Sequence, residues 1–224
     1  MKKIIAIGIT AAFLAGMSAS AIPVTVTIVS GDYQFGSGGE FNVSPVIGAG
    51  YTTGPNGTLV NNGFETFCFD RNPSITVPGN YNATLNGSGV DAFGLHLSVG
   101  VAWLYEQFAT GNLAGYNYVP GAGRAASAYN LQLAIWNLEG LYGAPGTLVG
   151  NTFLNEAISQ FVNVAGATAF TTGNAYDVGI LDLATANGDN VQPMLVLLPD
   201  GGSALILLGM SLSGMAVIAR KFRA

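Results

Sequence analysis

The amino-acid sequence predicts an α+β domain, β-rich and sandwich-like or barrel-like, with a helical insert of about three helices. Short segments with alternating apolar and polar residues, separated by glycine, occupy the first and last parts of the chain. Apolar residues recur at helical spacing only in the middle of the chain. This order argues against a sheet built from alternating strands and helices. Glycine supplies 32 of the 224 residues without a collagen period, which favours loop-rich β structure.

Strands are predicted on both sides of the helices. The clearest spans residues 24–28, where Val-Thr-Val-Thr-Ile alternates as in a half-buried strand. Because Pro193 has no N–H group, it places the last strand at a sheet edge. The other predicted strands span residues 33–35, 40–43, 64–70, 81–85, 176–183 and 191–198.

Three helices are predicted between the two groups of strands. Residues 95–108 are apolar on almost every side, as in a buried helix. A second helix is predicted from Arg124 to Glu139, ended by Gly140 and Gly143. The third runs from Thr152 to Val164, with Thr152 as its N-cap.

The charge content is low and its distribution excludes several functions. Only 8% of the residues are charged, against about 25% in an ordinary soluble domain. Between Ile22 and Pro199 two arginines, Arg71 and Arg124, stand against 11 acidic residues, a net charge of −9. A nucleic-acid partner is therefore not expected. One cysteine and one histidine exclude an intrachain disulfide and a Cys-based zinc site, and we expect no metal and no cofactor.

The N-terminus predicts export. Lys2 and Lys3 precede an apolar run over residues 4–17, and Ala19-Ser20-Ala21 follows. This order of charge, apolar core and small residues is typical of a secretory signal peptide. We expect a signal peptide over residues 1–21, cleavage after Ala21 and a single domain over residues 22–197.

The C-terminus, residues 198–224, predicts a sorting signal with one membrane helix. Residues 203–219 carry no charge and are followed by basic residues, which would hold that end in the cytoplasm. The preceding motif is Leu198-Pro199-Asp200-Gly201-Gly202. This tail resembles the VPDGG-CTERM class of sorting signals, relatives of the PEP-CTERM signals, with Leu198 in place of valine.

That resemblance implies a partner and a location. It implies an exosortase-type sorting enzyme that cuts at the motif after a transient stay in the inner membrane. The protein would then lie at the cell surface or in the extracellular matrix of a bacterium that forms exopolysaccharide and biofilm.

Two short motifs predict where chemistry occurs. Cys68, the lone cysteine, lies between Phe67 and Phe69 in a strand-like segment. In the second helix Tyr129, Gln132 and Trp136 share one stripe, which places a side-chain amide on a face that should be packed. A buried amide needs a bonding partner, because an unpaired one costs free energy.

The two motifs resemble those of thioester domains in bacterial surface adhesins, although Leu131 replaces the threonine usual before the glutamine. The resemblance implies a bond between the Cys68 sulfur and the Gln132 side-chain carbonyl, formed with loss of ammonia. Phe67, Phe69, Tyr129 and Trp136 would form a pocket that excludes water. The implied function is covalent adhesion or matrix attachment to a surface amine or polysaccharide, without enzymatic turnover.

The residues leave two alternatives open. One is a non-covalent extracellular matrix or carbohydrate-binding structural protein, in which Cys68 is an inert buried residue. The other is a secreted hydrolase that uses His96, but the chain has no Gly-x-Ser-x-Gly signature around a nucleophilic serine. A structural histidine is the preferred interpretation of His96.

Overall fold

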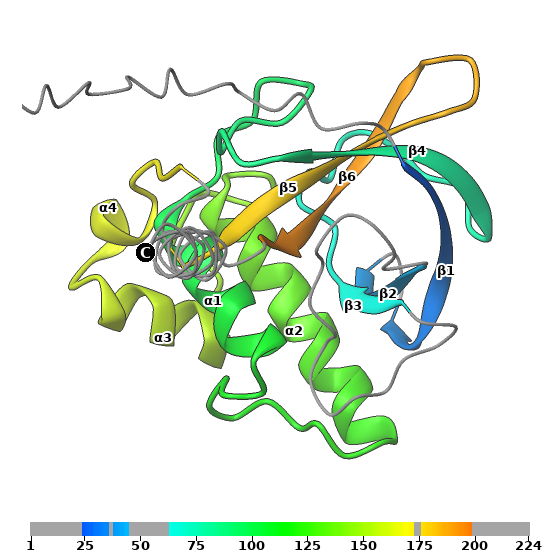
Figure 1. Cartoon of the computed structure of the whole chain (residues 1–224). Coiled ribbons are helices and arrows are strands. Elements are labelled where there is room, and N and C mark those ends of the chain that lie inside the picture. The colour runs from blue at the N-terminus through cyan, green and yellow to red at the C-terminus, as the bar shows by residue number, and fades with distance from the viewer. Residues whose placement is uncertain (1–23, 36–37, 45–62, 173–175, 199–224) are drawn as a thin grey trace, which may run out of the picture.

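The computed structural model describes residues 24–35, 38–44, 63–172 and 176–198, which fold into a mixed helix-and-strand domain (Figure 1). The four helices of this part of the chain all lie between β4 and β5 in sequence. The helical insert therefore contains one short helix more than the three predicted. The strands are β1 (Val24–Phe35), β2 (Gly38–Ser44), β3 (Phe64–Thr66), β4 (Gly79–Asn86), β5 (Val178–Ala184) and β6 (Asn190–Leu197). The helices are α1 (Val99–Ala109), α2 (Ala122–Leu138), α3 (Thr152–Gln160) and α4 (Val164–Ala167).

The strands form one antiparallel sheet in the order β3-β2-β1-β4-β5-β6. The sheet is curled, and the helices pack beside it (Figure 1). The described residues thus form a single curled sheet and not a two-layer sandwich. β1 joins the two strands predicted at residues 24–28 and 33–35, and its register with β2 shifts between Ser30 and Gln34.

The curl brings the end of β3 to β6. Residues 67–69, which directly follow β3, run antiparallel to β6: the N–H of Phe69 donates to the Pro193 carbonyl at 2.9 Å, and the N–H of Leu195 donates to the Phe67 carbonyl at 3.0 Å. Pro193 lies in β6, which is last in the sheet order as predicted, but β6 is not an open edge because residues 67–69 bond to its other side. Only the carbonyl of Pro193 is needed in that pairing. The strand predicted over residues 64–70 therefore divides into two parts with different partners.

The first and third helices start or end at other residues than predicted. α1 starts four residues later than predicted because the Leu97 N–H pairs with the Gly89 carbonyl, and Ser98 then caps the helix by accepting from the Val101 N–H. Asn151, not Thr152, caps α3. That helix ends at Gln160, shortly before Val162 takes a positive φ of 74°.

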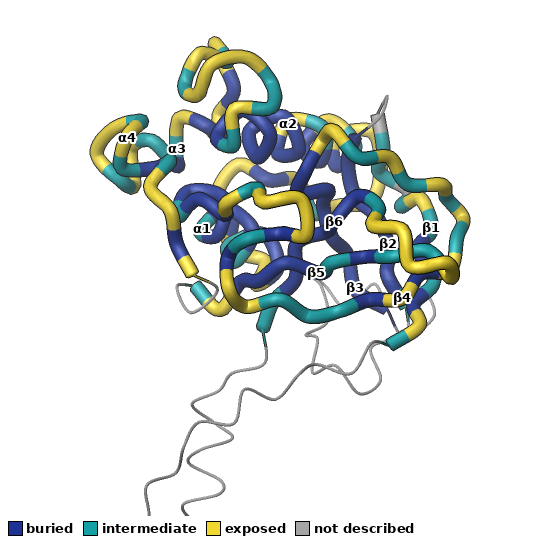
Figure 2. Tube along the Cα trace, turned by 90° about the horizontal axis from the view of Figure 1, so that it is seen from above, coloured by how far each residue is buried: buried dark blue, intermediate teal, exposed yellow. Residues whose placement is uncertain are grey.

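The central helix α2 lies against β1 and β2 and forms much of the core. Residues 131–138 are all buried, and Figure 2 shows this burial along α2 and the interior of the sheet. No helix in the described ranges is long and apolar enough to cross a membrane. The predicted signal peptide and the predicted membrane helix both lie outside the described residues.

Candidate functional site

The main chain at Cys68 needs a partner that the sheet does not supply. The pairing of β2 with β3 ends at Phe41 and Thr66, and the flanking Phe67 and Phe69 bond to β6. Because bonding directions alternate along a strand, the N–H and C=O of Cys68 face away from β6. Both groups are inside the protein, where leaving them unpaired would cost free energy.

The side-chain amide of Gln132 supplies both missing bonds. The Cys68 N–H donates to Gln132 Oε1 at 3.0 Å, and Gln132 Nε2 donates to the Cys68 carbonyl at 2.8 Å. Cys68 and Gln132 are both fully buried. The structure therefore brings together the cysteine and the glutamine that the sequence singles out, with the amide in the place that a neighbouring strand would take.

A glycine in β2 makes room for this amide. A Cβ atom at Gly38 would lie 2.8 Å from Gln132 Cγ and 3.3 Å from Trp136 Cη2, closer than packed carbon atoms approach. Gly38 thus lies directly on the two side chains, which are one helical turn apart on α2. With any larger residue at this position, either the Gln132 side chain or β2 would have to move.

The four predicted pocket aromatics have different surroundings. Trp136 is close to Gln132 beneath Gly38, whereas Phe67 turns toward α1 and packs edge-on against Phe108 with ring centroids 4.9 Å apart. Phe69 is fully buried, and Tyr129 is half-buried against the core. Trp136 is therefore the predicted aromatic that the structure places beside the Gln132 side chain.

The Cys68 thiol is fully buried. Burial raises its pKa well above the usual range, so the group is a neutral thiol at physiological pH. A thioester sulfur carries no charge at any pH. The surroundings of Cys68 therefore suit a neutral sulfur, as a thiol or as a thioester, better than a thiolate.

A pocket of about 360 Å³ is lined in part by Trp136, which lies one helical turn from Gln132 on α2. Its walls come from the segment after Cys68, from β1 and β2, from Trp136 of α2 and from Gln192 of β6. Arg71 forms one wall: its guanidinium donates to the Leu141 carbonyl at 3.1 Å and lies over the rings of Trp136 and Tyr142. We call this hollow the Arg71 pocket. Sequence reasoning missed it because its walls come from separate segments, although Arg71 is one of only two basic residues in the predicted domain.

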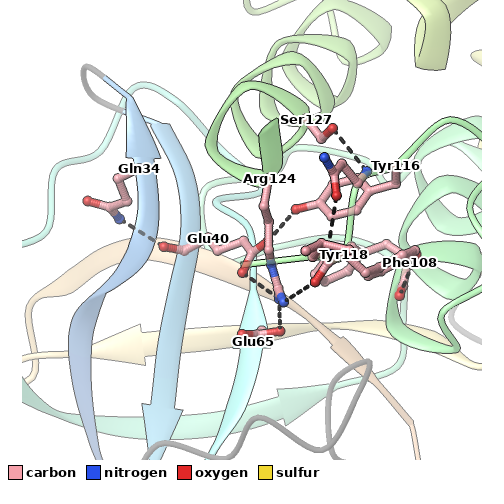
Figure 3. Close-up of polar contacts among 10 residues, drawn as sticks. Gln34, Glu40, Glu65, Phe108, Tyr116, Tyr118, Arg124 and Ser127 are labelled. Atoms are coloured by element: carbon pink, nitrogen blue, oxygen red, sulfur yellow. Dashed lines mark hydrogen bonds and ion pairs between the residues drawn. The ribbon is translucent and has the colours of Figure 1, made fainter. Parts of the chain in front are cut away.

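The other arginine holds a buried ion cluster at the start of α2 (Figure 3). Arg124 Nε and Nη2 donate to Glu40 at 2.9 Å, and Nη2 also donates to Glu65 at 2.6 Å. Tyr116 donates to Glu40. Burial and the Glu40 charge raise the pKa of Glu65 to about 7, although Arg124 acts to lower it. The cluster joins β2, β3 and α2, and it therefore positions the helix that carries Gln132.

The predicted signal peptide lies wholly outside the described residues. Of the sorting motif the structure describes Leu198 alone, whose N–H donates to the Asp177 carbonyl at 2.6 Å. Among the described residues no group of His, Cys, Asp or Glu side chains is arranged to hold a metal ion.

Comparison with protein-family models, with curated proteins and with solved structures gave no match for this chain.

Proposed function

We propose that the chain is an exported surface protein that attaches covalently to amines through a thioester between Cys68 and Gln132. The observation that supports this proposal is the fully buried Gln132 amide, bonded through both its oxygen and its nitrogen to the main chain of Cys68. The motif resemblance supports the thioester chemistry, and the predicted signals at the two ends support its location outside the cell. The protein would act once, as an adhesin or a matrix-attachment protein, and not as a turnover enzyme.

The hydrogen bonds suggest how the thioester forms. The Cys68 sulfur adds to Gln132 Cδ, the C–N bond breaks, and the amide nitrogen leaves as ammonia with the thiol proton. During this addition negative charge develops on Oε1, which already accepts a hydrogen bond from the Cys68 N–H. A fixed donor at that position stabilises the charge in the manner of an oxyanion hole. The Cys68 carbonyl holds the leaving nitrogen in place.

The second step would attach the partner. A neutral amine attacks Gln132 Cδ, the C–S bond breaks, and a proton from the amine passes to the Cys68 sulfur. An amide joins the partner to Gln132, and Cys68 returns to a thiol. Because both residues are fully buried in the free protein, bulk water is kept from the reacting carbon until a partner approaches.

Intact mass spectrometry of the exported protein tests this proposal. We expect a mass lower than that of the sequence by one molecule of ammonia, and a gain of one methylamine after treatment with that amine. Cys68→Ala and Gln132→Ala variants should show neither change. A mass equal to that of the sequence, with a thiol that alkylates only after unfolding, would refute the thioester.

That second outcome would favour the non-covalent alternative, a matrix or carbohydrate-binding structural protein with an inert Cys68. One observation supports this alternative: the Gln132 amide satisfies both main-chain groups of Cys68 without any covalent bond. In that case the glutamine would serve only to join α2 to residues 67–69.

Surface sorting is a separate part of the proposal. Pro199 and the two glycines after Asp200 would keep the backbone next to the membrane accessible to an exosortase-type enzyme. An Asp200→Lys variant should accumulate as uncut precursor in the inner membrane, detected by its mass and by fractionation. Release of mature protein at the normal mass and rate would contradict the sorting assignment.

A further inference from the structure

Among the described residues that line the Arg71 pocket, one side chain is charged and none is a carboxylate. The walls of the pocket combine the Arg71 guanidinium with the side-chain amides of Gln34, Asn72 and Gln192, and with apolar residues such as Ile75. A protonated lysine would be repelled at this wall. A carboxylate would be attracted to it, because guanidinium groups bind carboxylates through paired N–H donors.

Arg71 is held in position but is not neutralised. Its hydrogen bond to Leu141 uses one nitrogen, and the two aromatic rings support the guanidinium at 5.7 Å and 5.2 Å from their centroids. In the part of the chain that the structure describes, Arg71 forms no ion pair, and its side chain is exposed. The remaining N–H groups are available to an incoming ligand.

The same wall has a second unused donor. Trp136 is only 3% exposed, and its indole N–H is buried without a hydrogen-bond partner among the described residues. A buried donor without a partner costs free energy, which an acceptor that reached it would recover. The exposed Arg71 therefore favours a negatively charged ligand group in this pocket, and the Trp136 ring beside it would report the binding.

The charge of the whole domain restricts what carries that group. With a net charge of −9 between Ile22 and Pro199, the domain repels a polyanionic polysaccharide and attracts a lysine-rich protein. A basic partner protein that carries a carboxylate would suit both the positive charge of Arg71 in the pocket and the negative charge of the whole domain.

We propose that the Arg71 pocket binds an aspartate or glutamate next to the attacking lysine of a partner protein, and so selects which lysine is joined to Gln132. This inference rests on the proposed function and names its partner.

Conjugation rates of two peptides test the selection. The peptides are blocked at both ends and differ only in Asp or Asn beside a single lysine, and the adduct is measured by intact mass at low salt. We expect the Asp peptide to react about two- to five-fold faster, the range of an exposed ion pair. Arg71→Gln should remove this ratio, whereas Gln160→Ala, an exposed change on α3, should keep it. Comparing the two rates within each variant cancels any change in thioester content.

A non-covalent measurement separates the two proposals. In a Cys68→Ser variant, which cannot form the thioester, the Asp peptide should shift the indole N–H resonance of Trp136 and leave that of Trp103 unchanged. If the thioester forms but both peptides react equally and neither shifts Trp136, the selection is refuted and covalent attachment stands. If the Asp peptide shifts Trp136 while no thioester is found, the pocket stands without the covalent step. Tighter binding of an oligogalacturonate than of the Asp peptide would refute a protein partner.

Discussion

The Gln132 amide gives a sharp prediction at the scale of one residue. Gln132→Met keeps the length of the side chain but leaves the buried N–H and C=O of Cys68 without partners. We expect a loss of about 1–3 kcal/mol in the free energy of unfolding for each unpaired group. Urea unfolding in a Cys68→Ala background, where no thioester can contribute, measures this loss. The exposed Gln160→Met change should cost less than about 0.5 kcal/mol, and equal effects of the two substitutions would contradict the role of the amide.

Gly38 gives a second prediction at this scale. In Gly38→Ala the new methyl group would overlap Gln132 Cγ, so the amide or β2 must move. The expected destabilisation is about 1–3 kcal/mol, as for overpacked cores, together with a lower thioester content by intact mass. Gly87 is the matched control, since a Cβ there would meet only Leu198 at an ordinary 3.6 Å. An unchanged thioester content in Gly38→Ala would show that the amide does not depend on this close approach.

Sequence patterns singled out Cys68 and Gln132 but not the hydrogen bonds between them. The helical stripe that contains Gln132 predicts a buried amide that needs a partner, and the structure places that partner at the main chain of Cys68. This bonding depends on where β2 stops pairing with β3, which is a property of the folded sheet. The Arg71 pocket was not predicted for the same reason, because residues from β1 to β6 come together only in the folded chain.

At the scale of elements, the ion cluster makes stability depend on pH. Burial raises the pKa of Glu65 to about 7 from the ordinary 4.5, so the folded protein holds this proton more tightly than the unfolded chain. The contribution of this proton to the free energy of unfolding is complete below about pH 4.5 and is lost as the pH rises through about 7. Glu65→Gln removes this loss, so the stability of the variant relative to the wild type should increase between pH 5 and pH 8.

Urea unfolding of both proteins across that range checks the prediction. Burial also raises the pKa of Glu139, to about 8, but Glu139 is present in both proteins and cancels in the comparison. Parallel curves for the two proteins would show that Glu65 titrates normally in the folded state.

The helices and strands show why some boundaries could be predicted and others could not. The predicted α2 agrees with the helix to within two residues at each end, because buried residues recur along it and Gly140, with a positive φ, follows its end. By contrast, the predicted strand over residues 64–70 breaks after Thr66, since the next residues pair with β6 instead of β2. Alternation in sequence does not reveal which strand is the partner. The four-residue α4 is too short to give a periodic signal.

At the scale of the whole molecule, the contact between residues 67–69 and β6 closes the curled sheet around its core. If this contact opens only when the domain unfolds, the amide protons of Cys68, Phe69 and Leu195 should exchange with the free energy of global unfolding. Hydrogen exchange measured by NMR checks this expectation, with the amide of Val149, a residue that is 98% exposed, as a fast-exchanging reference. Faster exchange at Cys68 than at the centre of α2 would mean that the candidate site opens by itself.

The position of β6 also determines how the domain would respond to mechanical force. This strand continues directly into Leu198, where the proposed surface anchor begins, so tension from the cell would act along its length. β5 lies on one side of β6 and residues 67–69 on the other, with hydrogen bonds running across the direction of pull. These bonds would have to shear together and could not peel apart one at a time. A tether attached at this end would therefore pull on one of the most firmly held strands of the sheet, next to the residues that would hold the partner.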